Sequence, residues 1–160
     1  MTEKTQAMRA LEGKKIAYEV LTYSAETRDA EEVAQLIGLS PNEVFKTLVV
    51  MPPEPGRKPL LVMIPADKQL NLKQLALATG AKKLKMATQR EAEHLTGLQV
   101  GGISAVALLN KGFSVYIDRS VQAVPLVCIS AGKRGFQIRL PATALIKVTN
   151  ARVVDITSDE

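Results

Sequence analysis

The chain has 160 residues, of which 46% are hydrophobic and 23% charged, a composition typical of a folded globular protein rather than a disordered one. Its one cysteine and one histidine argue against a disulfide framework and against a zinc site built from histidine and thiolate ligands. No apolar run approaches the roughly 18 residues of a membrane-spanning helix, and no signal-peptide pattern opens the sequence. We therefore expect one domain over residues 1–160 that works in the cytoplasm, away from membranes and without a metal or cofactor.

The first half of the chain alternates short amphipathic helices with apolar strands. Glycine follows or ends three of the predicted helices, at Gly13, Gly38 and Gly80. The proline-rich stretch 52–59 can continue neither a helix nor a strand, and it predicts an exposed hairpin loop. The elements predicted in this half are helices over 5–13, 30–37 and 70–79, a capped turn over 40–43, and strands over 16–23, 44–51, 60–64 and 82–86.

The second half continues in the same mixed manner. The predicted elements are helices over 89–95 and 141–147, a short apolar piece at 106–109, and strands over 114–118, 126–130, 136–140 and 152–156. Strands and helices do not alternate strictly, so this order predicts an α+β domain built on a mixed sheet.

The net charge of +5 comes from 21 Lys and Arg against 16 Asp and Glu. Cations gather at Lys82, Lys83 and Lys85, and again at Lys133, Arg134 and Arg139. This excess suits an RNA or nucleotide partner, because neutralising phosphates releases counterions. A solvated basic face without a partner explains the charge equally well.

A lysine interrupts an apolar row in the strand predicted over 44–51. With period-two alternation, Lys46 shares one side with Val44, Leu48 and Val50, and Thr47 shares the other with Phe45 and Val49. An unpaired ammonium group away from water costs several kcal/mol. Lys46 is therefore expected to reach the rim, to pair with a carboxylate, or to bind an anionic ligand.

Two small-residue loops carry the clearest functional signal. Gly101-Gly102-Ile103-Ser104 and Ser130-Ala131-Gly132-Lys133-Arg134-Gly135 lie between apolar segments, and the second holds two adjacent cations. Glycine leaves backbone N–H groups uncovered, so such loops can surround an anionic or ester group. The second loop lacks the upstream glycine of a P-loop, which argues against a nucleotide-hydrolysing phosphate loop.

Taken in order with the strand 44–49, these loops resemble those of the YbaK-type aminoacyl-tRNA deacylases, and among them the free-standing enzymes that act on Cys-tRNA(Pro). The resemblance runs nearly end to end and includes 21–23, 25–27 and the helix end at 36–39. It implies a mixed, partly barrel-like sheet with surrounding helices. It also implies trans-editing, the hydrolysis of the ester that joins a wrongly attached amino acid, chiefly cysteine, to proline tRNA. Cysteine and proline have similar bulk, so a synthetase pocket cannot reject cysteine well enough without such a second step.

The resemblance also assigns roles to individual residues. It implies that Lys46 meets the terminal phosphate or ribose and that the backbone of Gly101 and Gly102 clamps the ester oxygen. The expected substrate-binding residues are Tyr23, Thr47, Ser104 and Ser130, and the expected RNA contacts are Lys133 and Arg134. Each of these residues also has an ordinary structural explanation, as a strand, turn or hairpin residue.

Neither candidate nucleophile in the sequence has the surroundings of a catalytic group. His94 lies in a polar helix without a serine or cysteine neighbour, and Cys128 alternates with Val127 and Ile129 in a strand. We expect His94 at the surface or a helix end and Cys128 in the core. In the family the substrate's own thiol is thought to attack its ester, which agrees with the lack of a protein nucleophile here.

One departure from the family leaves alternatives open. The family loop usually reads Gly-x-x-x-Pro, whereas this chain has Ala105 in the last position, which implies a looser loop. The chain could then remove another small amino acid such as alanine, which has no thiol and needs an activated water. It could also be a non-catalytic module that binds tRNA or a partner. The expected partners are the acceptor end of an aminoacyl-tRNA and, in addition, prolyl-tRNA synthetase; the sequence predicts no oligomeric state.

Overall fold

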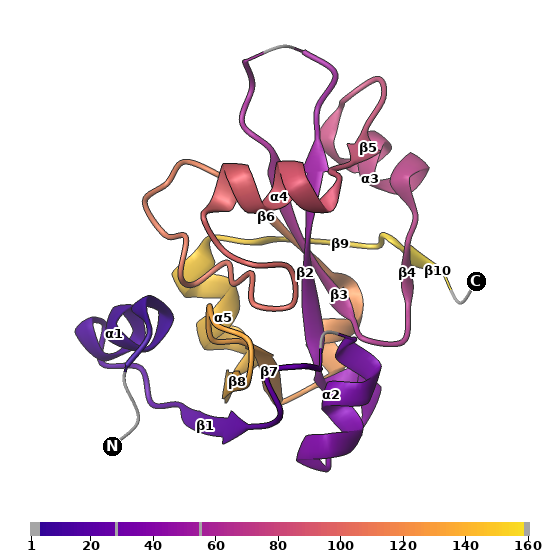
Figure 1. The fold of residues 1–160 in the computed structure, drawn as a ribbon. Helices are drawn as coiled ribbons and strands as arrows, with labels where there is room; N and C mark the ends of the chain where they lie inside the picture. The colour runs from indigo at the N-terminus through magenta and orange to yellow at the C-terminus, as the bar shows by residue number, and fades with distance from the viewer. Residues whose placement is uncertain (1–3, 28, 55, 159–160) are drawn as a thin grey trace.

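The computed structural model describes residues 4–27, 29–54 and 56–158. A five-stranded sheet forms its centre, with the strand order β5-β2-β3-β6-β9 (Figure 1). The pairs β5-β2 and β2-β3 are antiparallel, whereas β3-β6 and β6-β9 are parallel, so the sheet is mixed. The strands are β2 (Phe45–Met51), β3 (Leu60–Pro65), β5 (Lys85–Met86), β6 (Ser114–Asp118) and β9 (Arg152–Val154).

A second, antiparallel sheet lies beside the N-terminal end of β2. It has the order β1-β8-β7 and consists of β1 (Glu19–Thr22), β7 (Leu126–Ser130) and β8 (Phe136–Pro141). In the described chain, an isolated parallel bridge between Val44 and Cys128 joins the two sheets. The strands β4 (Gln69–Leu70) and β10 (Thr157–Ser158) form a separate antiparallel pair. The expected α+β fold on a mixed, partly closed sheet is confirmed.

Short helices surround the sheets. In Figure 1, α4 crosses in front of β2, while α2 lies at the lower end of that strand, opposite the β2–β3 hairpin loop. In the described part of the chain, no helix is both long and apolar enough to cross a membrane. The helices are α1 (Gln6–Gly13), α2 (Ala30–Ile37), α3 (Leu72–Thr79), α4 (Gln89–Thr96) and α5 (Ala142–Thr149), with 3-10 turns η1 (Pro41–Glu43) and η2 (Arg119–Ala123).

Side chains cover both faces of the five-stranded sheet. The central strand β3 is buried from Leu61 to Pro65, which explains why its sequence is continuously apolar rather than alternating. Phe45 and Val49 of β2 pack into the largest core cluster, whereas Val50 packs on the other face with Leu75 of α3. The period-two alternation predicted for this strand is therefore confirmed.

Several predicted boundaries are wrong, each for a local reason. The helix expected from Leu70 begins at Leu72, because the Asn71 side chain accepts a hydrogen bond from the Gln74 N–H (3.1 Å) and caps the first turn. Leu70 belongs instead to β4. The helix expected to run from Pro141 to about residue 147 begins at Ala142 and extends to Thr149, where Asn150 ends it in the left-handed region.

Three predicted strands are shorter than expected. The first covers only Glu19–Thr22, and that over 82–86 only Lys85–Met86. The last, expected over 152–156, covers only Arg152–Val154, and a separate short strand, β10, follows at Thr157–Ser158. Between them the Asp118 carboxylate accepts hydrogen bonds from the Ile156 N–H (3.1 Å) and the Thr157 hydroxyl (3.2 Å). These bonds hold residues 156 and 157 at the end of β6, and β9 ends at Val154.

Candidate active site

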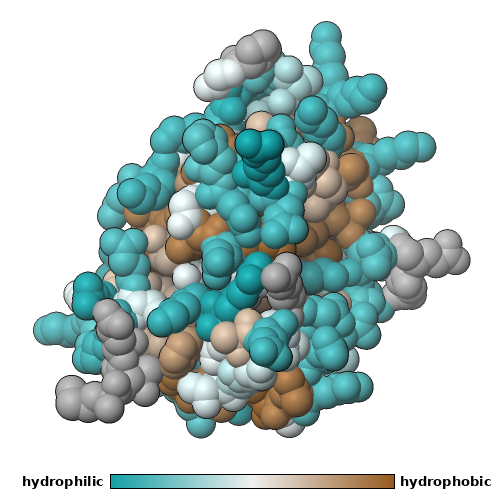
Figure 2. All heavy atoms as spheres, in the orientation of Figure 1, coloured by the Kyte–Doolittle hydropathy of each residue, from teal (hydrophilic) through white to brown (hydrophobic). Residues whose placement is uncertain are grey.

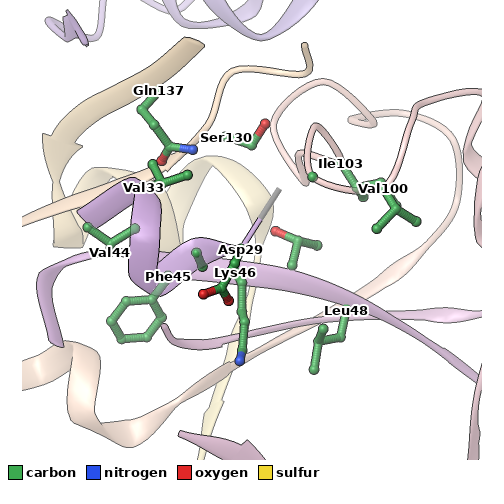
Figure 3. A pocket seen from close by; sticks show the side chains of 13 residues that line it. Asp29, Val33, Val44, Phe45, Lys46, Leu48, Val100, Ile103, Ser130 and Gln137 are labelled. Carbon is green, nitrogen blue, oxygen red and sulfur yellow. The ribbon is translucent and has the colours of Figure 1, made fainter. Parts of the chain in front are cut away.

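A cavity of about 170 Å³ lies where the start of β2 meets the second sheet (Figure 3). The strand β2 forms its floor, α2 one wall, and the loop after α4 and the ends of β7 and β8 the others. A volume of this order accommodates a molecule about as large as benzene, so it suits a small side chain and not a nucleotide. The lining residues are Asp29, Ala30, Val33, Val44, Phe45, Lys46, Thr47, Leu48, Val100, Gly101, Ile103, Ser130 and Gln137.

The structure brings four of the predicted site residues to this cavity: Lys46, Thr47, Gly101 and Ser130. They come from three segments far apart in the sequence, as the resemblance requires. The other predicted residues, Tyr23, Gly102, Ser104, Lys133 and Arg134, do not line it.

Lys46 is half-buried and its amine is held at one end of the cavity. Its Nζ donates a hydrogen bond to the backbone carbonyl of Ala66 (3.2 Å), and no carboxylate of the described residues forms an ion pair with it. In Figure 3 the side chain extends away from Ser130 and Gln137. An ammonium group has three donors, so two remain for a ligand after the bond to Ala66.

Two buried hydroxyl groups in this part of the molecule lack a partner. The Thr47 Oγ1 and the Tyr23 hydroxyl are both inaccessible to solvent and form no hydrogen bond with the described residues. A buried polar group without a partner costs free energy, and a native protein usually retains one only for a reason. Thr47 lies on the cavity wall, so a bound substrate could supply its missing partner.

The loop over 97–103 is held at Val100 from both sides. The Val100 N–H donates to the Glu93 carboxylate (2.9 Å), and its carbonyl accepts from the Arg134 Nε (2.7 Å). Gly101 follows in a left-handed conformation, with φ 92°. Gly101 and Ile103 both line the cavity, and within the described chain their N–H groups donate no hydrogen bond.

The two glycine-containing loops touch each other directly. A Cβ atom on Gly102 would lie 2.9 Å from the backbone nitrogen of Arg134, so only glycine fits at position 102. Its place in the motif is thus explained by loop packing. Ser104 is fully buried, and its hydroxyl accepts a hydrogen bond from the Ala107 N–H (3.4 Å).

The two expected RNA contacts differ in their surroundings. The Arg134 side chain is only 14% exposed, and besides Val100 it faces the Glu93 carboxylate at 4.0 Å. Its guanidinium group is therefore used inside the protein. Lys133 is exposed, with its Nζ 5.7 Å from the centre of the Phe136 ring.

Sequence reasoning missed two polar residues of the cavity, Gln137 and Asp29. Gln137 pairs with Ser130 across β7 and β8, and its Oε1 accepts a hydrogen bond from the Cys128 thiol (3.6 Å). In Figure 3 the amide nitrogen of Gln137 points toward Ser130. Asp29 precedes α2, makes no capping bond there, and is the sole acidic side chain in the described lining.

Neither Cys128 nor His94 provides a nucleophile. Cys128 is fully buried, and burial raises the pKa of its thiol to about 12, so it stays protonated near neutral pH. His94 is exposed in the last turn of α4, outside the cavity lining. The expectations of a core cysteine and a surface histidine are confirmed.

Comparison with known proteins gives a consistent picture. The profile of the aminoacyl-tRNA editing domain matches residues 24–148. A protein of Enterococcus faecalis that carries the name of a Cys-tRNA(Pro)/Cys-tRNA(Cys) deacylase is 36% identical over 160 residues, which cover 99% of this chain and 96% of the relative. A proline–tRNA ligase of Thermodesulfovibrio yellowstonii is 30% identical over 117 residues, which are 73% of this chain but only 19% of the ligase.

Solved structures agree with the sequence relatives. A structure described as a trans-editing enzyme for prolyl-tRNA synthetase superposes with a TM-score of 0.83 at 27% identity and covers 98% of this chain and 99% of its own. A hypothetical protein gives a TM-score of 0.85, also at 27% identity, over 96% and 99% of the two chains. The matched profile, the full-length relative and the shared fold together establish that this chain belongs to the aminoacyl-tRNA editing domain family.

Proposed function

We propose that this protein hydrolyses mischarged aminoacyl-tRNA in trans, and that its main substrate is Cys-tRNA(Pro). The observation that carries the proposal is the cavity itself, where Lys46, Thr47, Gly101 and Ser130 surround a space of about 170 Å³. The name of the 36% identical relative supports cysteine as the amino acid. The described residues would form a single editing domain.

The cavity suits a reaction in which the substrate provides the nucleophile. A cysteine thiol has a pKa of about 8.5, so a few per cent is thiolate at neutral pH. Its sulfur would attack the ester carbonyl carbon, forming a carbon–sulfur bond. The ester carbon–oxygen bond then breaks, and the ribose oxygen leaves with the thiol's proton. Water would open the resulting four-membered thioester and release free cysteine.

The protein's part would be to hold the ester and to stabilise the developing charge. The free N–H groups of Gly101 and Ile103 would donate to the carbonyl oxygen as it becomes an oxyanion. The hydroxyls of Thr47 and Ser130 would orient the aminoacyl group. Lys46 would use its two remaining donors on the terminal ribose or phosphate.

The residues outside the lining would act indirectly. Gly102 and Arg134 would set the position of the Gly101 amide through the contact between the two loops. Ser104 would fix the turn that follows, and Tyr23 would enter the site only if its unpartnered hydroxyl turns toward substrate. Lys133 remains a proposed RNA contact.

Asp29 supports a second candidate, the removal of an amino acid without a thiol, such as alanine. A carboxylate on the cavity wall is the kind of group that can take a proton from water. In that case Asp29→Asn lowers the hydrolysis of Ala-tRNA(Pro). If the thiol reaction is correct, the same substitution leaves the hydrolysis of Cys-tRNA(Pro) within about threefold of wild type.

The proposal is tested by incubating the purified protein with Cys-tRNA(Pro) and following the loss of the ester. We expect rapid deacylation by the wild type and a loss of at least tenfold for Lys46→Ala, with Lys46→Arg between the two. An ester lifetime that is the same with and without protein contradicts the proposal. Binding without turnover across several aminoacyl-tRNAs would favour a non-catalytic module.

As to partners, the acceptor end of the tRNA would bind at the mouth of the cavity. Prolyl-tRNA synthetase would supply the mischarged tRNA, and the reaction would take place in the cytoplasm, where aminoacyl-tRNAs are made and used.

A further inference from the structure

A groove with cationic walls lies at the far end of β2 from the cavity. It has a volume of about 530 Å³ and lies between the β2–β3 hairpin loop, the end of α4 and the segment before β6. Arg57, Lys58 and Lys111 are its charged lining residues, and no carboxylate of the described chain lines it. Its apolar lining includes Met51, Leu95, Leu108 and Phe113.

Lys58 joins the walls of this groove. Its ammonium group donates a hydrogen bond to the Lys111 carbonyl and lies 5.8 Å from the centre of the Phe113 ring. Lys58 therefore fixes the hairpin loop to the segment before β6. The charges of Arg57 and Lys111 remain on the outside: the Arg57 side chain is 67% exposed and makes one ion pair, with Glu54 at 3.7 Å.

The predicted lysine cluster adjoins the same end of the sheet. Lys85 pairs with Met51 in the strand register, and Lys82 and Lys83 precede it on the surface. Figure 2 shows hydrophilic side chains over this upper end of the molecule. Glu91 is the carboxylate near Lys85, and its pKa lies below its ordinary value, first through the hydrogen bond from the Thr88 N–H. We name the cations Arg57, Lys58, Lys82, Lys83, Lys85 and Lys111 the hairpin-end basic surface.

The groove and the cavity lie along the same two segments of the chain. Leu48 of β2 lines the cavity and Met51 lines the groove, three residues and about 10 Å further along the strand. Gly97 lines the groove and Val100 the cavity, again three residues apart. A distance of this size corresponds to about three stacked nucleotides of one strand.

We infer that the hairpin-end basic surface binds the phosphodiester backbone of the RNA strand whose 3′ end occupies the cavity. This inference rests on the proposed function. Six cations gathered at this end of the molecule match a regularly charged polyanion. RNA is favoured over an acidic protein because the groove and the cavity share β2 and the segment 97–100, and the cavity is the proposed site of the aminoacyl end. The principal RNA contact thereby moves away from Arg134, whose guanidinium is occupied inside the protein.

The test compares two charge-neutralising substitutions with matched controls. Arg57→Gln and Lys111→Gln alter the proposed surface. Arg119→Gln is the control for Arg57, because Arg119 is also 67% exposed, has a similar ion pair (Asp155, 3.6 Å), and follows the opposite end of β6. Lys147→Gln is the control for Lys111, because Lys147 is an exposed lysine of α5, away from the groove lining.

The first readout is the binding of uncharged tRNA across a range of salt concentrations. Combining Arg57→Gln with Lys111→Gln should weaken binding about tenfold or more and reduce the slope of log affinity against log salt by about 2, one unit per lost contact. The combined controls should leave both within about twofold of wild type. Equal effects of the two pairs on the affinity overturn the inference.

The second readout separates this inference from the proposed function. A short substrate, cysteine esterified to adenosine, reaches the cavity but not the groove. The groove variants should hydrolyse it at the wild-type rate and full Cys-tRNA(Pro) at least about fivefold more slowly at low concentration. If wild type hydrolyses neither substrate, the proposed function fails, while the binding result still decides the inference. A defect seen only when synthetase is added would show a protein partner instead and overturn it.

Discussion

At the scale of single residues, Thr47 offers a test of whether the cavity binds substrate or Thr47 is an ordinary strand residue. Its hydroxyl is buried on the cavity wall without a partner, which is unfavourable for stability alone. We predict that Thr47→Val leaves stability unchanged or raises it by up to about 1 kcal/mol, because the unpaired hydroxyl disappears. The same substitution should lower kcat/KM about 3- to 10-fold, the value of one hydrogen bond to substrate.

Chemical denaturation and single-turnover deacylation measure these two effects, with Thr47→Ser as the control that keeps the hydroxyl. A variant that is less stable but fully active would show that Thr47 serves the fold and not the substrate.

Cys128 yields a prediction about alkaline pH. Burial raises its thiol pKa from 9.0 to about 12, so the folded state holds the proton more tightly than the unfolded state. The resulting stability is complete below pH 9.0 and is lost as pH rises toward about 12. We predict that Cys128→Ala, which cannot titrate, loses less stability than wild type between pH 9 and 11, whatever its stability at pH 7. Thermal unfolding at a series of pH values measures this difference; parallel curves for the two proteins would contradict it.

At the scale of elements, the contact between the two glycine loops determines where the Gly101 amide lies. Since a Cβ at position 102 would meet backbone at 2.9 Å, we predict that Gly102→Ala destabilises the protein by about 1–3 kcal/mol and lowers kcat more than the stability loss explains. Gly13→Ala is the matched control: a Cβ there meets nothing within 4 Å, and the residue is helical, so stability should rise by up to about 1 kcal/mol. Unfolding curves and kinetics on the same preparations test both. A Gly102→Ala protein as stable and active as wild type would show that the contact between the two loops does not position the Gly101 amide.

Arg134 joins the same loop to α4. We predict that Arg134→Met costs about 1.5–3 kcal/mol, because the Val100 carbonyl and the Glu93 carboxylate both lose a charged donor. Glu93→Gln should be less harmful in the Arg134→Met background than alone, as expected for groups in one network. A four-protein unfolding cycle gives the coupling, and tRNA affinity should stay within about twofold of wild type. Unchanged stability with weakened RNA binding would restore Arg134 as an RNA contact.

The elements of this fold were predictable where a local pattern determines them. The β2–β3 hairpin follows from a proline-rich loop between apolar runs, and β3 from five consecutive apolar residues. The bend between β9 and β10 was not predictable, because it depends on Asp118, which lies 38 residues away in the sequence from Ile156. Ala105 had implied a looser loop; the structure shows it fully buried, in a loop that Glu93 and Arg134 hold through Val100.

The site was predictable to the extent that glycine motifs and a misplaced lysine mark it. Gln137 and Asp29 carried no such signal, since Gln137 is an ordinary strand residue until the pairing of β7 with β8 places it opposite Ser130. Asp29 looks like a helix cap, and only the position of α2 beside the cavity places it in the lining. These two residues become cavity residues only through strand register and the packing of segments distant in the sequence, which the local sequence does not reveal.

At the scale of the whole molecule, β2 connects two surfaces of different character. Its first half passes through a small, partly apolar cavity, and its last residue lines a groove with cationic walls. In the proposed function, a compact aminoacyl group would occupy the cavity and the charged strand of the nucleic acid would remain outside. The cavity and the groove thus lie toward opposite ends of β2, as the proposals for a substrate with a small end and a long polyanionic body require.

The central claim is that the cavity holds the aminoacyl ester while the substrate's own thiol cleaves it. The most direct test is the rate at which the protein deacylates the same tRNA(Pro) carrying either cysteine or serine, two side chains of similar size that differ in one atom. The account predicts that cysteine is released at least about a hundredfold faster, because a serine hydroxyl is almost never ionised near neutral pH. Equal rates for the two esters would show that a water molecule or a protein group attacks instead, and would contradict the account.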